Sequence, residues 1–174
     1  MTGKSIPVQI FYFLLFIAIQ LILLRNAVLF NIAFCFVYIA FILLLPLETP
    51  PLILLILGFV TGFIVDIFYN TLGIHSASCV LIAFIRPFVI KILTPGRGYE
   101  MGTNISINLL GLQWFSIYSG ILIFIHHVML FYIEIAGTRM FFFTLSKAIC
   151  STIFTFVVIV IIQYLFFYSK KSRK

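Results

Sequence analysis

The feature that most constrains this chain is a series of long apolar stretches separated by short polar breaks. The stretches cover residues 7–24, 28–45, 51–69, 74–93, 109–133 and 140–168. A helix of about 20 mostly apolar residues crosses the hydrocarbon core of a membrane, because it rises about 1.5 Å per residue and the core is about 30 Å thick. Each stretch comes close to this length or exceeds it. The sequence therefore predicts six membrane-spanning helices that form a single domain over residues 1–174.

The composition favours lipid over water as the main solvent. Hydrophobic residues make up 64% of the chain and charged residues 9%, whereas soluble domains contain about 25% charged residues. Membrane β-barrels alternate apolar and polar residues over strands of about ten positions, and the sequence does not show this pattern. We therefore expect an all-α integral membrane protein.

The positions of the basic residues predict the orientation in the membrane. Six spans place both termini on one side, and Lys and Arg are enriched in cytoplasmic loops. The opposite side carries Arg25, Arg139 and Lys147. The side of the termini carries eight basic residues: Lys4, Arg86, Lys91, Arg97, Lys170, Lys171, Arg173 and Lys174. We therefore expect both termini and the Gly-rich loop at Pro95 to be cytoplasmic.

The basic residues near this boundary are expected to contact the cytoplasmic surface. Arg86 precedes Pro87, which predicts a kinked helix and an arginine that snorkels to the interface. A contact of Arg86, Lys91 or Arg97 with anionic lipid headgroups or with a partner protein is also expected. The basic tail at 169–174 is typical of an anchor on anionic lipid. Because aromatic platforms are not interleaved with these bases, the net charge of +7 does not indicate nucleic acid.

Gly58, Gly62 and Asp66 lie four residues apart and therefore share one face of the third predicted helix. Small residues at this spacing allow another helix to approach closely. A carboxylate inside a membrane helix costs about 2.5–3.5 kcal/mol to insert, so Asp66 is expected to face protein or a watery cavity. Three roles remain open for it. Asp66 reaches the membrane interface or bonds the amides of the following turn; it contacts another helix of this chain or of a partner; or it takes part in a proton or ion relay, for which the sequence offers few further acidic or His groups.

The histidines are expected to be structural. His126 and His127 lie within the fifth predicted helix, and neighbouring helical residues point about 100° apart, so the pair does not readily bind one metal ion. Hydrogen bonds to other helices are the expected role for both. His75 follows Gly73, and a polar residue is common where a helix begins.

No catalytic motif is present in the sequence. It contains no nucleophile elbow, HExxH motif, P-loop or pair of carboxylates in one segment. We therefore expect no enzyme activity, no cofactor and no metal. Three single thiols lie in apolar runs and are interpreted as buried apolar residues: Cys35, Cys79 and Cys150.

The segment from Gly58 to His75, GFVTGFIVDIFYNTLGIH, resembles the signature of the MreD family of bacterial rod shape-determining membrane proteins. In that family a Gly-rich span leads to an Asp, then to a turn with a Gly, then to a further span. The order of parts is similar along nearly the whole chain. The sequence differs at Phe30-Asn31, where many relatives have Pro-Asp, and the last two spans resemble the family only in hydropathy.

The resemblance implies a non-catalytic scaffold in the bacterial inner membrane that takes part in the elongation of peptidoglycan along the side wall. It implies MreC as the direct partner, with RodA, a class B transpeptidase and MreB in the same assembly. Under this hypothesis the surface on which the MreC membrane helix docks is built from helix-packing residues, namely Gly58, Gly62, Asp66, Gly73 and His75.

Two other functions remain as alternatives. The MreD fold resembles the substrate-binding subunit of energy-coupling-factor transporters, which implies a vitamin-like ligand in an outward cavity near Asp66 and His75. A lipid-modifying enzyme is the third hypothesis, and it would require essential groups such as His126 and His127.

Overall fold

The computed structural model describes residues 6–96, 98–99, 104–135 and 140–167, and these are mostly helical. Five helices in this part of the chain are long and apolar enough to cross a membrane. They are α1 (Ile6–Ala18) with its π-helical extension η1 (Ile19–Leu23), α3 (Pro51–Tyr69), α4 (Ile74–Ile92), α6 (Leu112–Ile135) and α7 (Phe141–Phe167). The predicted helical membrane architecture is thus confirmed, with five long helices in place of six.

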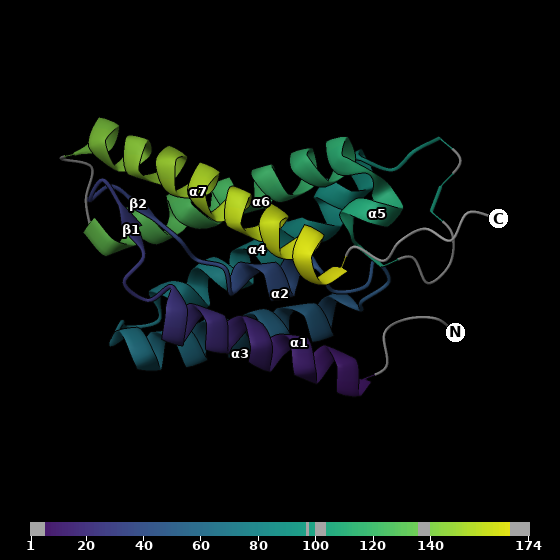
Figure 1. Ribbon diagram of the computed structural model, residues 1–174, viewed down its shortest axis with the longest axis horizontal. Helices are drawn as coiled ribbons and strands as arrows, with labels where there is room; N and C mark the ends of the chain where they lie inside the picture. The colour runs from purple at the N-terminus through teal and green to yellow at the C-terminus, as the bar shows by residue number, and fades with distance from the viewer. Residues whose placement is uncertain (1–5, 97, 100–103, 136–139, 168–174) are drawn as a thin grey trace.

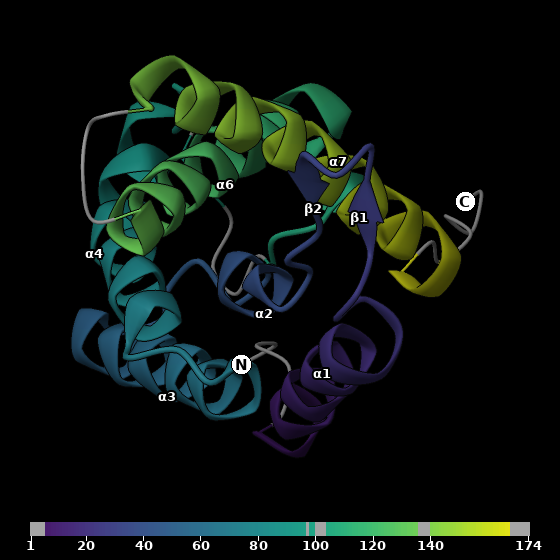
Figure 2. The ribbon, with the colours of Figure 1, turned by 90° about the vertical axis from the view of Figure 1, so that its left-hand side faces the viewer.

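The long helices run side by side along the molecule (Figure 1). The first residues of α1 and the last residues of α7 lie at the same end, which also holds the short helix α5 (Ile107–Leu110) and which we call the loop end. The other end holds the antiparallel strands β1 (Val28–Leu29) and β2 (Ala33–Phe34), and we call it the hairpin end. Seen along the bundle, the long helices surround the short helix α2 (Ile39–Leu43) (Figure 2).

The predicted helix at residues 28–45 does not form, and this is the main correction to the fold. The chain instead makes the β-hairpin, an extended stretch (residues 35–36), a turn and α2, and it returns along the bundle to the loop end (Figure 1). Residues 35–45 are all buried. Hydropathy indicates only that a segment is kept away from water. It therefore does not distinguish an irregular segment buried in protein from a helix that faces lipid. Irregular backbone is tolerated at membrane depth when protein surrounds it.

Helix α7 supplies hydrogen bonds that the irregular segment cannot make with itself. A backbone N–H or C=O group without a hydrogen bond costs roughly several kcal/mol in lipid, so each one needs a partner. The amide of Phe34 donates to Ser151 Oγ at 2.9 Å, and the amide of Phe36 donates to Thr155 Oγ1 at 3.1 Å. These hydroxyls tie the hairpin and the extended stretch to α7.

Gln20 supplies the matching bonds from the opposite side. It lies in η1, where the amide of Leu24 donates to Ile19 O in the wider π-helical pattern. Its Nε2 donates to Cys35 O at 3.1 Å and to Tyr69 Oη at 2.8 Å, and its Oε1 accepts from the amide of Tyr38 at 3.4 Å. One fully buried amide side chain therefore joins η1, the extended stretch and α3.

Candidate functional site

The predicted row of Gly58, Gly62 and Asp66 faces α4 of the same chain. All three residues are buried. A Cβ atom at Gly62 would lie 2.4 Å from Ser76 Cα, and one at Gly58 would lie 3.0 Å from both Ala83 Cβ and Cys79 O. The glycines therefore allow the backbones of α3 and α4 to touch. The row is used for packing within the chain, and α4 occupies the face that was predicted to form part of a docking surface.

Asp66 caps the N-terminus of α4. Its Oδ1 accepts from the amide of His75 at 3.0 Å and from Thr71 Oγ1 at 2.5 Å, and its Oδ2 accepts from the amide and hydroxyl of Ser76 at 2.9 and 2.6 Å. The residue that precedes α4, Gly73, has a φ of 83° and no side chain for capping, so a carboxylate from α3 takes that role. The negative charge is stabilised by the helix dipole of α4. The predicted contact within the fold is confirmed.

Tyr38 links two of the buried histidines. Its hydroxyl lies 2.7 Å from His75 Nδ1 and 3.0 Å from His126 Nε2, which joins the start of α2 to α4 and α6. His126 Nδ1 is buried and has no partner in the described part of the chain. His127 donates from Nδ1 to Ile123 O at 2.7 Å, and its Nε2 lies 3.2 Å from Thr155 Oγ1. The predicted hydrogen bonds from the paired histidines to other segments are confirmed.

Arg86 does not snorkel, so this prediction and the predicted cytoplasmic contact of Arg86 are wrong. The side chain is 1% exposed and points into the bundle. Nη2 donates to Leu45 O and to Pro46 O, the latter at 3.2 Å, and Nε donates to Tyr118 Oη at 2.8 Å. Tyr118 donates in turn to Leu43 O at 3.0 Å. Arg86 therefore satisfies the carbonyls of Leu45 and Pro46, which follow α2.

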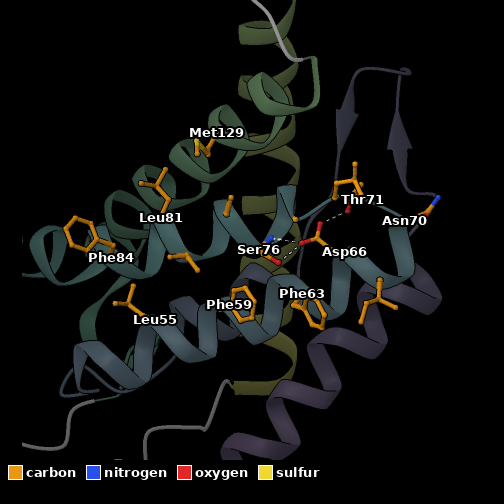
Figure 3. A pocket seen from close by; sticks show the side chains of 15 residues that line it. Leu55, Phe59, Phe63, Asp66, Asn70, Thr71, Ser76, Leu81, Phe84 and Met129 are labelled. Atoms are coloured by element: carbon orange, nitrogen blue, oxygen red, sulfur yellow. Dashed lines mark hydrogen bonds between the residues drawn. The ribbon is translucent and has the colours of Figure 1, made fainter.

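A groove of about 1110 Å³ runs along the outside of the α3–α4 hairpin (Figure 3). Its polar side chains lie together near the hairpin end, where Asp66 bonds to Ser76 and Thr71. The rest of its lining is mostly apolar and includes Leu55, Phe59, Phe63, Val80, Leu81, Phe84 and Met129. Asp66 already accepts four bonds, so the groove offers a partner a long apolar surface with a polar group at one depth only.

The remaining predicted residues are less informative. Lys91 is exposed in the last turn of α4, at the loop end. Arg97, Lys4, Arg139 and the basic tail at 169–174 lie outside the described residues. Several polar residues that hold the irregular segment are not among the predicted site residues, namely Gln20, Tyr38, Tyr118, Ser151 and Thr155. Each of them is a polar residue within an apolar run. This pattern could have identified them, because a buried polar group in a membrane needs a hydrogen-bond partner.

Within the residues that the structure describes, no group of three or more His, Cys, Asp or Glu side chains is placed to hold a metal ion. Comparison of the chain with protein-family models, with curated proteins and with solved structures finds no match. The structure of this helical membrane protein therefore has three notable features. They are an α3–α4 pair held by close packing and by the Asp66 cap, a buried network of polar side chains, and an open groove on the outside of α3 and α4.

Proposed function

We propose that this protein is a non-catalytic scaffold of the bacterial inner membrane, and that the groove along α3 and α4 docks the single membrane helix of a bitopic partner such as MreC. RodA, a class B transpeptidase and MreB would join the same assembly, which elongates the cell wall. The resemblance of the segment from Gly58 to His75 motivates the identity of the partner. The observation that carries the docking role is the open apolar groove with polar groups at one end.

The dimensions of the groove suit a transmembrane helix. Along α3 its lining extends from Leu55 to Asn70, which corresponds to about 22 Å of helix. Lipid is as apolar as a helix surface, so helices associate in membranes through close packing and polar contacts rather than through a hydrophobic driving force. The ridge made by Phe59 and Phe63, whose rings stack 5.7 Å apart, provides packing surface. The polar groups near Asp66 and Ser76 would set the depth of the partner.

The base of the groove is preorganised for binding. Gly62 brings α3 and α4 into backbone contact, and Asp66 ties the two helices at the hairpin end. A surface that is already fixed loses little conformational entropy when a partner binds. The polar groups of the groove, Asp66 and Ser76, are engaged in these structural bonds, which favours a scaffold over an enzyme.

The docking surface is tested by filling the groove. Ala77 is exposed and lines it, so Ala77→Trp would place an indole where the partner helix packs. The matched control is Ala18→Trp, because Ala18 is exposed on α1 and lies outside the groove. Ala77→Trp should reduce co-purification with MreC at least tenfold while Ala18→Trp leaves it unchanged. Equal recovery of MreC by both variants would exclude the groove as the docking surface.

The cellular role has a separate test. Depletion of this protein in a rod-shaped source should give rounded cells, because side-wall synthesis loses its scaffold. Cells that keep a rod shape after depletion would contradict the role in elongation, even if MreC still binds.

A further inference from the structure

A second cavity, of about 210 Å³, lies at the hairpin end and shares only Thr71 with the lining of the docking groove. It is formed where several distant segments meet: the turn after η1, the extended stretch, and parts of α4, α6 and α7. The residues that define its chemistry are Arg25, Phe36, His75, Phe131, Glu134 and Lys147. The scaffold function proposed above does not use this cavity.

His75 presents an unused polar atom to the cavity. The side chain is 3% exposed, and its Nδ1 is bound to Tyr38 Oη at 2.7 Å. Its Nε2 has no hydrogen-bond partner among the described residues. Unlike His126 Nδ1, this atom is not among the fully buried side-chain atoms that lack a partner. Because His75 lines the cavity, we take Nε2 as the atom that it offers to a molecule bound there. A polar atom of a bound molecule would give this nitrogen a hydrogen-bond partner.

The charges around the cavity favour an anion. Lys147 is already engaged, since its Nζ lies 3.1 Å from Glu134 Oε2 and 4.5 and 4.3 Å from the ring centroids of Phe34 and Phe131. The Arg25 guanidinium lies 5.7 Å from the Tyr69 ring centroid, and the described residues provide it with no carboxylate. The lining therefore keeps one positive charge in excess, and Arg25 carries it at an exposed position.

We propose that this cavity binds a small aromatic carboxylate. The carboxylate would pair with the planar guanidinium of Arg25, which suits a two-oxygen acceptor, and the ring would lie among the aromatic side chains of the wall. His75 Nε2 would bond a polar atom at the inner end. The volume of about 210 Å³ is below the roughly 300–1,000 Å³ of sites for drug-sized ligands, so the ligand is a small molecule with a single aromatic ring.

The test uses 3-phenylpropionate with the purified full chain in detergent, measured by isothermal titration calorimetry. The alcohol 3-phenylpropanol and the amine 3-phenylpropylamine have the same ring and carbon chain but lack the negative charge. The carboxylate should bind saturably to one site, the alcohol at least tenfold more weakly, and the amine without saturation. Absence of saturable binding of the carboxylate, or equal binding of all three probes, would overturn the proposal.

Two variants locate the site. Arg25→Gln removes the exposed guanidinium, and Lys91→Gln removes an equal charge from an exposed residue at the loop end. Arg25→Gln should weaken binding of 3-phenylpropionate at least tenfold, and Lys91→Gln should leave it unchanged. An equal loss in both variants would show attraction to net charge and would refute the site. Both variants should still co-purify with MreC, so failure of the ligand site is distinguishable from failure of the scaffold proposal.

Discussion

Replacing Gly62 with Ala is the most direct test of how the α3–α4 hairpin is fastened. The new Cβ would lie 2.4 Å from Ser76 Cα and 2.6 Å from both His75 O and Ser76 N, all of which are backbone atoms. Ordinary contact begins at 3.4 Å, so α4 would have to move by about 1 Å. No rotation of a side chain can relieve this overlap.

The movement acts on two contributions to stability. Overpacking of a tight contact costs about 1–3 kcal/mol. The same turn of α4 donates to Asp66 from His75 N and Ser76 N, and loosening a hydrogen bond to a charged group costs about 1.5–3 kcal/mol. Alanine returns up to about 1 kcal/mol through its higher helix propensity. We therefore expect Gly62→Ala to lower the free energy of unfolding by about 3 kcal/mol.

The cysteines provide the assay. Cys35 and Cys79 are buried and Cys150 is exposed. In a Cys150→Ser background, a thiol-reactive dye reports unfolding, because both remaining thiols become reactive only when the bundle opens. In a titration with a denaturing detergent, the dye should label the Gly62→Ala protein at a clearly lower detergent concentration than the parent.

Two glycines give matched controls. Gly58→Ala meets atoms at 3.0 Å and should cost less than Gly62→Ala, and Gly120→Ala meets nothing within 4 Å and should be neutral or slightly stabilising. If Gly62→Ala unfolds at the same detergent concentration as Gly120→Ala, the close approach of α3 and α4 is not what holds the hairpin.

Two further predictions concern the irregular segment inside the bundle. Arg86→Met should lower the free energy of unfolding by about 3 kcal/mol, because it leaves the carbonyls of Leu45 and Pro46 without a donor. The thiol-labelling assay described above measures this loss, and a stability equal to that of the parent would refute the capping role. Thr155→Val should cost about 1–3 kcal/mol because the amide of Phe36 loses its acceptor, whereas Thr155→Ser should keep most of the stability. Hydrogen exchange at the Phe36 amide should accelerate in the valine variant alone, and equal protection in both variants would contradict the bond.

The sequence by itself determined where the long helices lie. The stretch predicted at 51–69 is α3 as observed, and those at 74–93, 109–133 and 140–168 differ from α4, α6 and α7 by at most three residues at either end. This succeeds because a lipid-exposed segment must satisfy its own backbone, which leaves the helix as the only choice for a single span. The four-residue spacing likewise places Gly58, Gly62 and Asp66 on one face without further information.

Only the tertiary structure decided what the segment at 28–45 becomes and what the polar residues bind. Its amide at Phe34 is satisfied by Ser151, which lies 117 residues away, and its carbonyl at Leu45 is satisfied by Arg86, which lies 41 residues away. Local hydropathy contains no record of such partners. An irregular backbone is stable at membrane depth only when distant side chains complete its hydrogen bonds, so its shape is a property of the assembled bundle.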